Sequence, residues 1–556
     1  MSKDFIERPR KNEKDSAIQY VKQLLEQALE EHRNEDANKL EEVIRLLQTK
    51  KYGLVWEEHA EIVEEEMKTK IPVFVEDVEK KIAGNPDSHN YNFLLEGDNL
   101  HSLKLLEKTH AGKIDVIYID PPYNTGNKDF IYNDKIIDKN DGYSHSKWLS
   151  FMSKRLEYAR VLLNDSGLIY ISIDNNEQSQ LKLLCDSIFG ETNFVANLIW
   201  SNREGGGSSD SKLFRLKHEY ILVYSKNIDA VEIKGVPISN EDRYKLSDEY
   251  EATRGKYYLQ KLGMGSIQYS ESLDYPIEAP DGSFIMPSDN NNGKKACWRW
   301  SRKKFEWGLK NGFVEIKQNV KDEWVVYTKQ YLKADNDGNI ILRSQRPMGV
   351  IDSFSSTQGA KQLKNIIPDA PFSYPKDTNL ISWLLDRTDN KNSQVLDFFA
   401  GSGTTGHAVE QLNQEDGGNR RYILCTNNEN NICEEVTYKR LTNIQKELPH
   451  NLKYFKTDFV IKEEFPDDTL EFKLLDYITP LVELEFGVDI SNPSVQIILT
   501  EEHLGDLIKE NKLERDSTIF IHPGVFLDSR EEALLSELNI SLQEIPNYYF
   551  GKELWS

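Results

Sequence analysis

The sequence predicts an α/β fold in which a mostly parallel sheet is interrupted by an inserted domain. From about residue 91, short apolar strand patterns alternate with amphipathic helix patterns, which is typical of parallel strands joined by helices. The alternation stops between about residues 203 and 370, in a stretch rich in Gly, Asn and Tyr, and then resumes. A chain of 556 residues is also too long for a single hydrophobic core, so several domains are expected.

The same patterns divide the chain into five segments. Apolar residues recur at helical spacing in the first segment, which predicts an N-terminal helical region, either a solvated helix pair or an arm that contacts another protein. The sheet is expected in two parts that flank the insertion, with one further core strand at 218–226. A smaller α/β domain is expected at the C-terminal end. The predicted boundaries are 1–88, 89–202, 203–370, 371–458 and 459–556.

The composition is that of a globular protein in a reducing compartment. Hydrophobic residues make up 38% of the chain, and no apolar run is long enough to span a bilayer. The first residues are charged throughout and lack the apolar middle of a signal peptide. The four cysteines are scattered, so we expect neither disulfides nor a metal site. These features predict a cytoplasmic protein without a membrane partner.

The charge of the chain is unevenly distributed. The formal net charge of −23 is unfavourable for binding a polyanion. Residues 203–370, however, contain 26 Lys and Arg against 23 Asp and Glu, so the acidity lies outside the insertion. Acidic outer domains could simply keep the protein soluble. Alternatively, the middle region contacts a polyanion while the acidic parts stay away from it.

A catalytic candidate lies where an apolar strand stops abruptly. The sequence VIYIDPPYNTG, residues 116–126, runs from four apolar residues into Asp120, two prolines and Tyr123. Because Pro121 and Pro122 can neither donate to a sheet nor continue a helix, the strand must end there. The carboxylate and the phenol ring are thus expected at a strand end, where open α/β sheets bind their ligands.

A cofactor candidate is the glycine-rich loop in QVLDFFAGSGTTGHAVEQL, residues 394–412. Gly401 and Gly403 allow the backbone to approach a ligand closely, and Thr404 and Thr405 are expected to cap the following helix. The loop lacks the Lys-Ser/Thr pair of a nucleotide triphosphatase. A tight turn between a strand and a helix would have similar glycines, so the loop alone is weak evidence.

The residues around this loop suit a nucleoside with an amino-acid tail better than a polyphosphate. Asp397 is expected to meet an ammonium group, and Phe398 and Phe399 are expected to line the adenine or sulfonium region. Glu429 follows the next strand, where an acid usually binds a ribose diol. A surface acid explains Glu429 equally well.

Together these motifs carry a family resemblance. The DPPY sequence combined with DFFAGSGTTG resembles the S-adenosylmethionine-dependent amino-methyltransferases of DNA, in the order of the circularly permuted beta class. Longer stretches, among them LLEGDNLHSLKLL, HEYILVYSK and WRWSRKKFEWGLKNG, resemble the modification (Mod) subunit of type III restriction–modification systems. The resemblance covers about 90 to 440. It implies a Rossmann-like methyltransferase core with an inserted target-recognition domain.

The resemblance implies methyl transfer from S-adenosylmethionine to the exocyclic amine of a flipped-out base. Two acceptors would free the delocalised lone pair of the amine: the Asp120 carboxylate and the Pro121 carbonyl, stiffened by Pro122. Tyr123 would stack on the base, and Tyr224 is a candidate for the opposite wall, although an ordinary strand-end tyrosine is as good an explanation. An aspartate in the first position points to the 6-amino group of adenine. A cytosine C5 enzyme would need a Pro-Cys motif, which the chain lacks.

The resemblance also assigns two charged residues to the cofactor. Lys376, in SYPKDT, is expected to reach its carboxylate, and Asp98, in EGDN, is expected beside its adenine. In the insertion, the basic aromatic run 294–308 suits contacts with phosphates and bases, with tryptophan packing as the alternative. The residues expected to contact DNA are Arg299, Trp300, Arg302 and Lys303.

The leading hypothesis is therefore a dimeric DNA adenine methyltransferase that binds double-stranded DNA as a type III Mod subunit. Two alternatives stay open. One is an amino-methyltransferase acting on RNA or on a protein amide, and the other is a subunit that recognises DNA for a nuclease–helicase partner. No helicase or nuclease motif occurs in the 556 residues, so cleavage is expected to require a separate restriction subunit.

Overall fold

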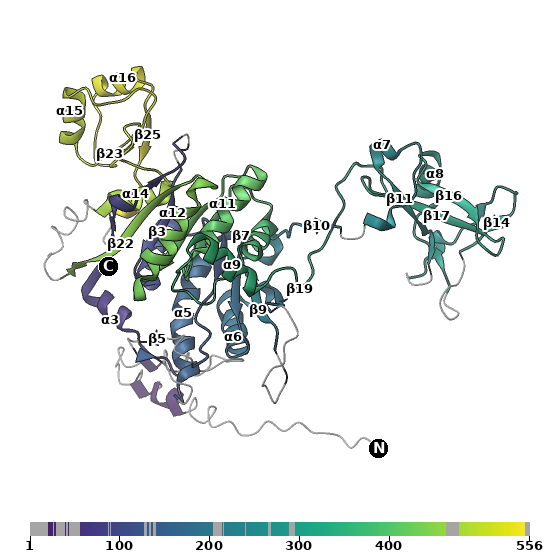
Figure 1. The fold of residues 1–556 in the computed structure, drawn as a ribbon, viewed down its shortest axis with the longest axis horizontal. Coiled ribbons are helices and arrows are strands. Elements are labelled where there is room, and N and C mark those ends of the chain that lie inside the picture. The colour runs from purple at the N-terminus through teal and green to yellow at the C-terminus, as the bar shows by residue number, and fades with distance from the viewer. Residues whose placement is uncertain are drawn as a thin grey trace. The chain divides into compact units, whose positions relative to one another are not determined.

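The computed structural model divides into two compact units, which are drawn in Figure 1. One unit contains residues 1–232 and 349–556, and the other contains residues 233–348. The second unit is thus an insertion into the first. The structure describes residues 20–25, 27–28, 39–40, 43, 56–86, 88, 90–126, 131–132, 135–136, 141–203, 214, 216–238, 241–264, 268–287, 295–462 and 477–550.

The first unit is organised around one large sheet, which has 11 strands among the described residues. Neighbouring strands follow the order β1 (Lys70–Glu76), β22 (Asn451–Ile461), β3 (Asn92–Glu96), β21 (Arg421–Thr426), β20 (Gln394–Asp397), β4 (Ile114–Ile119), β7 (Leu163–Ile173), β9 (Glu219–Ser225), β8 (Phe194–Trp200) and β19 (Val350–Ile351), and β22 also pairs with β2 (Ile82–Ala83). The strands from β22 to β7 are parallel to one another, whereas β1, β2 and β9 run antiparallel to their neighbours. This confirms the predicted mostly parallel sheet.

Strand β20 lies next to β4, although the two are far apart in the sequence. Val395 pairs with Val116, and Leu396 pairs with Ile117. Because the two strands are parallel, their carboxyl ends meet at the same edge of the sheet. The permuted order of the motifs therefore still brings the strand end at Asp120 next to the glycine-rich loop.

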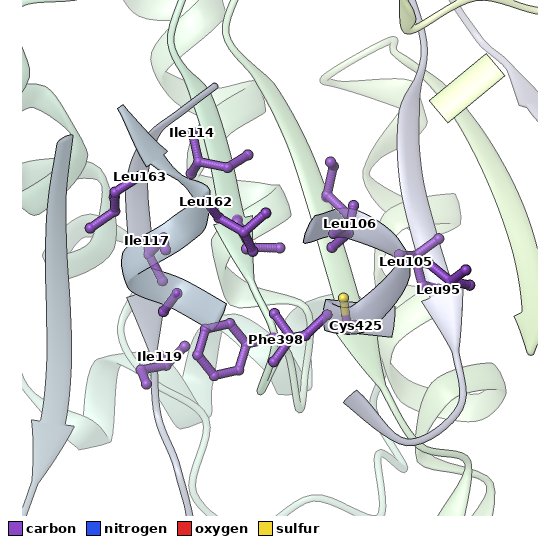
Figure 2. Packing of buried hydrophobic residues seen from close by; sticks show 14 of the residues in the cluster. Leu95, Leu105, Leu106, Ile114, Ile117, Ile119, Leu162, Leu163, Phe398 and Cys425 are labelled. Carbon is purple, nitrogen blue, oxygen red and sulfur yellow. The ribbon is translucent and has the colours of Figure 1, made fainter. Parts of the chain in front are cut away.

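Two rows of helices pack along the sheet (Figure 1). One row contains α4 (Asn99–His110), α5 (Ser144–Leu162), α6 (Gln178–Phe189) and α14 (Ile478–Phe486), and the other contains α9 (Ser356–Ile366), α10 (Thr378–Leu385), α11 (Thr404–Asp416) and α12 (Lys439–Asn443). Figure 2 shows the core under α4 and α5, where Ile117 and Ile119 of β4 pack with Leu106 and Leu162. Burial on both faces is what parallel strands require, and it explains their almost continuous apolar runs.

The inserted unit is shorter at both ends than the predicted 203–370. Strand β9 belongs to the large sheet, as predicted for 218–226. On the other side, Val350 and Ile351 of β19 pair with β8, and helix α9 packs on α12, so these residues also belong to the first unit. The Gly- and Asn-rich composition had extended the predicted domain into connecting segments. The inserted unit itself spans residues 233–348.

The prediction of an N-terminal helical region over residues 1–88 is wrong for the part that pairs with the sheet. The described helix α3 (Ile62–Thr69) is followed directly by strand β1, which pairs along its whole length with β22. Residues before 56 lie almost entirely outside the described residues. The short apolar segment Lys70–Glu76 can be recognised as a strand only from its partner β22, which follows later in the chain.

The C-terminal residues form the expected small α/β module. Strands β23 (Val495–Ile498), β24 (Thr518–Ile521) and β25 (Ser541–Glu544) are parallel, and helices α15 (Glu501–Lys509) and α16 (Ser529–Glu537) connect them. Helix α14 precedes the module and packs into the main core. Within the described residues, none of the helices is both long and apolar enough to cross a bilayer.

A buried ion cluster joins the two ends of the first unit. The ammonium of Lys453, on β22, lies 3.0 Å from Glu76 of β1 and 2.9 Å from Asp489, which follows α14. Glu483 of α14 lies 2.5 Å from the same nitrogen. Because Lys453 is fully buried, three carboxylates around it are needed to offset the loss of water.

The inserted unit has its own hydrophobic core. Its largest sheet is antiparallel and contains β11 (Tyr257–Lys261), β17 (Trp324–Tyr331) and β16 (Val314–Gln318). Helix α8 (Arg302–Lys310) packs on β16. The core is mainly aromatic and contains Tyr257, Trp298, Trp300, Phe313 and Tyr331. A separate core is consistent with a domain that folds as a unit.

Candidate active site and cofactor loop

Four side chains meet at the end of β4. The Tyr123 hydroxyl donates a 2.7 Å hydrogen bond to Oδ1 of Asp120, which directly follows the strand. Lys376, just before α10, places its ammonium 3.0 Å from Oδ2 of Asp120 and 2.8 Å from the Tyr123 oxygen. Both carboxylate oxygens of Asp120 are thus occupied by donors. Each oxygen still has a second lone pair, and 26% of the Asp120 side chain is exposed, so Asp120 can accept a further N–H beside these donors.

The fourth side chain, Glu219, was not anticipated from the sequence. Its Oε2 lies 3.2 Å from the Lys376 ammonium and accepts a 3.2 Å hydrogen bond from Tyr123, while Asn202 donates to Oε1 at 2.7 Å. Glu219 opens β9, which is antiparallel to β7, so the start of β9 lies at the edge where the parallel strands end. An acid before an apolar strand was the available signal. Glu219 reaches the site only because β9 runs antiparallel to β7, and this direction cannot be predicted from the sequence.

Opposing effects set the pKa of the Asp120 carboxyl. Burial raises it, the charge of Lys376 lowers it, the charge of Glu219 raises it, and the net direction is upward. Burial also works against the Lys376 ammonium, but Asp120 and Glu219 outweigh it and raise the pKa of Lys376. The site therefore holds two acids that compete for one cation.

A hydrogen bond from α5 fixes the second proline. The indole of Trp148 is fully buried and donates a 2.7 Å hydrogen bond to the Pro122 carbonyl. Asn124 follows in a left-handed conformation, with φ of +55°, and its amide donates to Glu177 at 2.6 Å. These contacts leave little freedom to the turn that presents Asp120 and Tyr123.

Asp397 holds the glycine-rich loop together, and this differs from the predicted contact with an ammonium group. Its Oδ1 accepts a 2.9 Å hydrogen bond from the Phe399 amide, and its Oδ2 accepts one of 2.5 Å from the Thr405 hydroxyl. Both oxygens are therefore used within the loop, and only 2% of the residue is exposed. Burial raises the pKa of Asp397 to about 7.

The loop has the backbone conformation that its glycines predict. Gly401 and Gly403 have φ of +48° and +72°, in the left-handed region that favours glycine. A Cβ at Gly401 would lie 3.3 Å from the Phe372 ring, so the loop has little room for a side chain. The predicted caps are wrong in detail, because Gly403 itself is the N-cap of α11 and Thr404 is the first helical residue.

A buried arginine lies under this loop. Arg440, on α12, donates to the Thr404 hydroxyl at 2.9 Å, to the Ser402 carbonyl at 3.3 Å and to the Thr378 hydroxyl at 2.9 Å. The side chain is fully buried, and burial lowers the pKa of Arg440 to about 9. Its partner residues are far away in the sequence, so the sequence offered no signal for this role.

The two aromatic residues of the loop have different surroundings. Phe398 is fully buried in the main core, among Ile119 and Cys425 (Figure 2), so the expectation that it lines the cofactor is wrong. Phe399 is partly exposed, and its ring centroid lies 5.8 Å from that of Phe151. Only Phe399 is therefore placed to contact a ligand.

Two further predicted cofactor residues lie at the ends of neighbouring strands. Asp98, after β3, accepts a 2.8 Å hydrogen bond from the Leu100 amide and so caps α4, with 34% of its side chain exposed. Glu429, after β21, is exposed. Since β3, β21, β20 and β4 are parallel neighbours, both acids share the sheet edge with the glycine-rich loop.

The structure contradicts the assignment of Tyr224 to the wall of a base pocket. Tyr224 pairs with Ile169 inside the sheet, whereas Tyr220 is the residue that pairs with Ile173 at the edge. The Tyr224 ring is fully buried under α6, and its hydroxyl donates to Asp186 at 2.7 Å. This is the ordinary strand tyrosine that the sequence left open.

The four predicted DNA-binding residues of the inserted unit differ in their exposure to solvent. Trp300 is 7% exposed and belongs to the core of that unit, so its prediction is wrong. Arg299 is partly buried and donates to the Lys261 carbonyl at 2.5 Å. Arg302 and Lys303 are exposed in the first turn of α8. Only these two offer their charge to a partner.

A comparison with known protein families shows the family to which this chain belongs. Residues 114–438, more than half of the chain, match the model of the DNA methylase family. The chain therefore belongs to the DNA methylase family. The matched range begins with strand β4 and includes both the Asp120 cluster and the glycine-rich loop.

Three curated relatives are similar to this chain. The Mod subunit of the type III restriction-modification enzyme StyLTI of Salmonella typhimurium is 35% identical over 414 residues, which cover 68% of this chain and 59% of that protein. The EcoPI Mod subunit of Escherichia phage P1 is 32% identical, with 62% and 58% covered. The type II methyltransferase M.KpnI of Klebsiella pneumoniae is 33% identical, with 62% and 82% covered. The match thus spans less than two thirds of the length of the first two relatives.

Proposed function

We propose that this protein transfers a methyl group from S-adenosylmethionine to the exocyclic 6-amino group of adenine in DNA. One observation carries the proposal: the Asp120–Tyr123 turn and the glycine-rich loop follow adjacent parallel strands, so a base amine and a methyl donor would meet at one sheet edge. Membership of the DNA methylase family supports the reaction class.

The residues at the glycine-rich loop fit S-adenosylmethionine. Gly401 and Gly403 give a close backbone approach, the N-terminal turn of α11 offers amide groups to the carboxylate, and Phe399 offers an aromatic face to the adenosine. Asp98 and Glu429 are the acids for the adenosine end. The cofactor supplies an electrophilic methyl group when it is bound.

The catalytic turn holds the target amine. Asp120 accepts one N–H of the amine and the Pro121 carbonyl accepts the other, which directs the nitrogen lone pair away from the ring. The amine can use a second lone pair of an Asp120 oxygen to which Tyr123 or Lys376 already donates. Tyr123 then stacks on the base, which must leave the duplex to reach the site. Holding both partners in place supplies most of the rate.

Lys376 has two roles open to it in this scheme. Its contacts with Asp120 and Glu219 make it the counter-ion of the catalytic acid. Its predicted contact with the cofactor carboxylate remains a proposal. If an incoming amine takes the place of Lys376 at Asp120, Glu219 still pairs with the lysine. The buried ammonium is therefore not left without a partner.

The inserted unit is proposed to recognise the target sequence. It contains 19 Lys and Arg against 16 Asp and Glu, in contrast to the acidic chain as a whole. Arg302 and Lys303 on α8 are its proposed phosphate contacts. The similarity to two type III Mod subunits supports the proposal that the chain acts as a modification subunit. A cytoplasmic homodimer that binds double-stranded DNA and works with a separate restriction subunit is proposed on the same basis as in the sequence analysis.

The test is a methyl-transfer assay with purified protein and S-adenosylmethionine labelled in the methyl group. Genomic DNA from a strain lacking the gene is the substrate, and the digested nucleosides are separated by mass spectrometry. We expect label in N6-methyladenine with the wild type and none with Asp120→Asn, which keeps the size of the side chain. Label in N4-methylcytosine, or label only in total RNA or protein extract offered in parallel reactions, would overturn the proposal.

A further inference from the structure

Arg155 is a buried guanidinium behind the cofactor loop. It lies on α5, its side chain is fully buried, and all five of its N–H groups have acceptors. One donates to the Phe151 carbonyl in its own helix at 2.7 Å. The other four connect the N-terminal segment with the residues proposed to hold the adenosine end of the cofactor.

Two of these donors bind Glu61, which belongs to the N-terminal segment. Nη1 and Nη2 of Arg155 lie 2.7 Å and 3.1 Å from the two carboxylate oxygens. Glu61 is only 6% exposed, and it is the N-cap of α3, where it forms a capping box with Glu64. This paired geometry is the strong form of an Arg–carboxylate contact. Glu61 lies outside the range that matches the family, 114–438.

A third donor reaches Asp98, the proposed adenosine acid. Nη2 of Arg155 lies 3.3 Å from Oδ1 of Asp98, which also accepts the Leu100 amide. Oδ2 of Asp98 accepts no hydrogen bond from any described residue. With 34% of the side chain exposed, Oδ2 is available to a ligand. Arg155 thus decides which oxygen of Asp98 faces outward.

The fourth donor reaches the loop itself. Nε of Arg155 donates to Oδ1 of Asn99 at 2.6 Å, and the Asn99 amide donates to the Phe398 carbonyl at 2.7 Å. The guanidinium also lies 3.7 Å from the Phe151 ring centroid, and Phe399 packs against the same ring. Asp98 and both aromatic positions of the loop are therefore tied to one arginine.

We infer that Glu61 is a positioning residue of the cofactor site: it fixes Arg155, and through Arg155 it orients Asp98 and the loop for the adenosine end of S-adenosylmethionine. Without the Glu61 carboxylate, Asp98 becomes the nearest acid to a buried cation. Asp98 would then turn both carboxylate oxygens towards Arg155, and neither oxygen would be available to bind the ligand. The inference rests on the proposed function, and it extends the site into the N-terminal segment.

The test is isothermal titration of the full-length protein with S-adenosylmethionine and with 5′-methylthioadenosine, which lacks the amino-acid tail. We expect Glu61→Gln to weaken the binding of both ligands by the same factor, about tenfold. In methyl transfer, KM for S-adenosylmethionine should rise by that factor while kcat is retained. Glu65→Gln, which changes an exposed residue of the same helix, should change neither. Equal affinity for Glu61→Gln and the wild type would overturn the inference.

A double-mutant cycle separates positioning from a general loss of structure. If Glu61 acts in part through Asp98, then the loss of affinity in the variant that combines Glu61→Gln with Asp98→Asn is clearly smaller than the sum of the two single losses. Additive losses would overturn the inference. Glu61→Asp keeps the buried charge but shortens its reach, so it should give an intermediate loss even if Glu61→Gln folds poorly. A wild type that does not bind S-adenosylmethionine would instead overturn the proposed function.

Discussion

The ammonium nitrogen of Lys376 lies 3.0 Å from Oδ2 of Asp120, at the end of strand β4. Glu219, the first residue of strand β9, approaches the same nitrogen to 3.2 Å. One cation is therefore shared between two carboxylates. Burial raises the pKa of Asp120, and these two charges act on it in opposite directions, so the ionisation that the proposed acceptance of an amine N–H requires depends on all three.

The two partners of Lys376 and Asp120 should shift the pH dependence of methyl transfer in opposite directions. Lys376 lowers the pKa of Asp120 and Glu219 raises it. Asp120 must be ionised to accept the amine, so activity falls on the acid side of its pKa. In kcat/KM profiles, we expect Lys376→Met to move the acid limb to higher pH and Glu219→Gln to move it to lower pH, each by about one unit.

The change of sign is the control in that experiment. A general loss of structure at the site would lower kcat/KM at every pH without moving the limb. Shifts of the same sign for both variants would contradict the charge balance described for Asp120.

Tyr123 and Tyr224 should behave differently when only the hydroxyl is removed. Tyr224→Phe loses the hydrogen bond to Asp186 inside the protein, so we expect about 1 kcal/mol less stability and unchanged kcat. Tyr123→Phe keeps the ring for stacking but frees Asp120 and Lys376 from their shared hydroxyl, so we expect a change in kcat/KM. Urea unfolding and methyl-transfer kinetics on both variants measure these effects. A large loss of kcat in Tyr224→Phe would show that Tyr224 does act in the base pocket.

Substitutions in the basic aromatic run of the inserted unit should distinguish residues that contact DNA from residues of the hydrophobic core. Arg302→Ala and Lys303→Ala should each lower the slope of log K against log salt by about one, because each removes one phosphate contact. Trp300→Ala should leave the slope unchanged and cost about 3 to 5 kcal/mol of stability, because the indole is buried. Lys321→Ala, an exposed lysine elsewhere in the unit, is the matched control. Equal slopes for the wild type and both α8 variants would remove α8 from the DNA interface.

The buried Asp397 should make stability depend on pH. Its pKa is raised from 3.8 to about 7, so between these values the folded protein holds a proton that the unfolded chain has released. The free energy of unfolding therefore falls as pH rises through this window. Relative to Asp397→Asn, we expect the wild type to lose roughly 2 to 4 kcal/mol between pH 4 and pH 7.5 in urea unfolding. Asp369→Asn, an exposed acid, should follow the wild type, and parallel curves for Asp397→Asn would reject the assignment.

The sequence predicted those parts of the site that lie within single motifs. Asp120 and Tyr123 were recognisable because two prolines end a buried strand, and Gly401 and Gly403 because a strand leads through them into a helix. The order of the two motifs carried the family resemblance, whereas their position at one sheet edge comes from the pairing of β20 with β4. The mostly parallel sheet followed from the alternation of strands and helices.

The parts that failed depend on strand direction and on partners far away in the chain. Tyr224 was misplaced because β9 runs antiparallel, which brings Glu219 rather than Tyr224 to the site. Trp300 could not be distinguished from a surface aromatic without knowing that an aromatic core forms around it. Arg155 and Arg440 appear as ordinary helix charges, and their burial becomes evident only when the helices are packed.

Asp120 is proposed to bind the 6-amino group of adenine for methylation, and modified-base sequencing in cells tests this role most directly. DNA is sequenced from cells that express the wild type, Asp120→Ala or the surface control Asp369→Asn. A motif containing N6-methyladenine in the wild type and the control, and absent in Asp120→Ala, is the predicted result. The same adenine pattern with Asp120→Ala, or no modified adenine with the wild type, would contradict the claim.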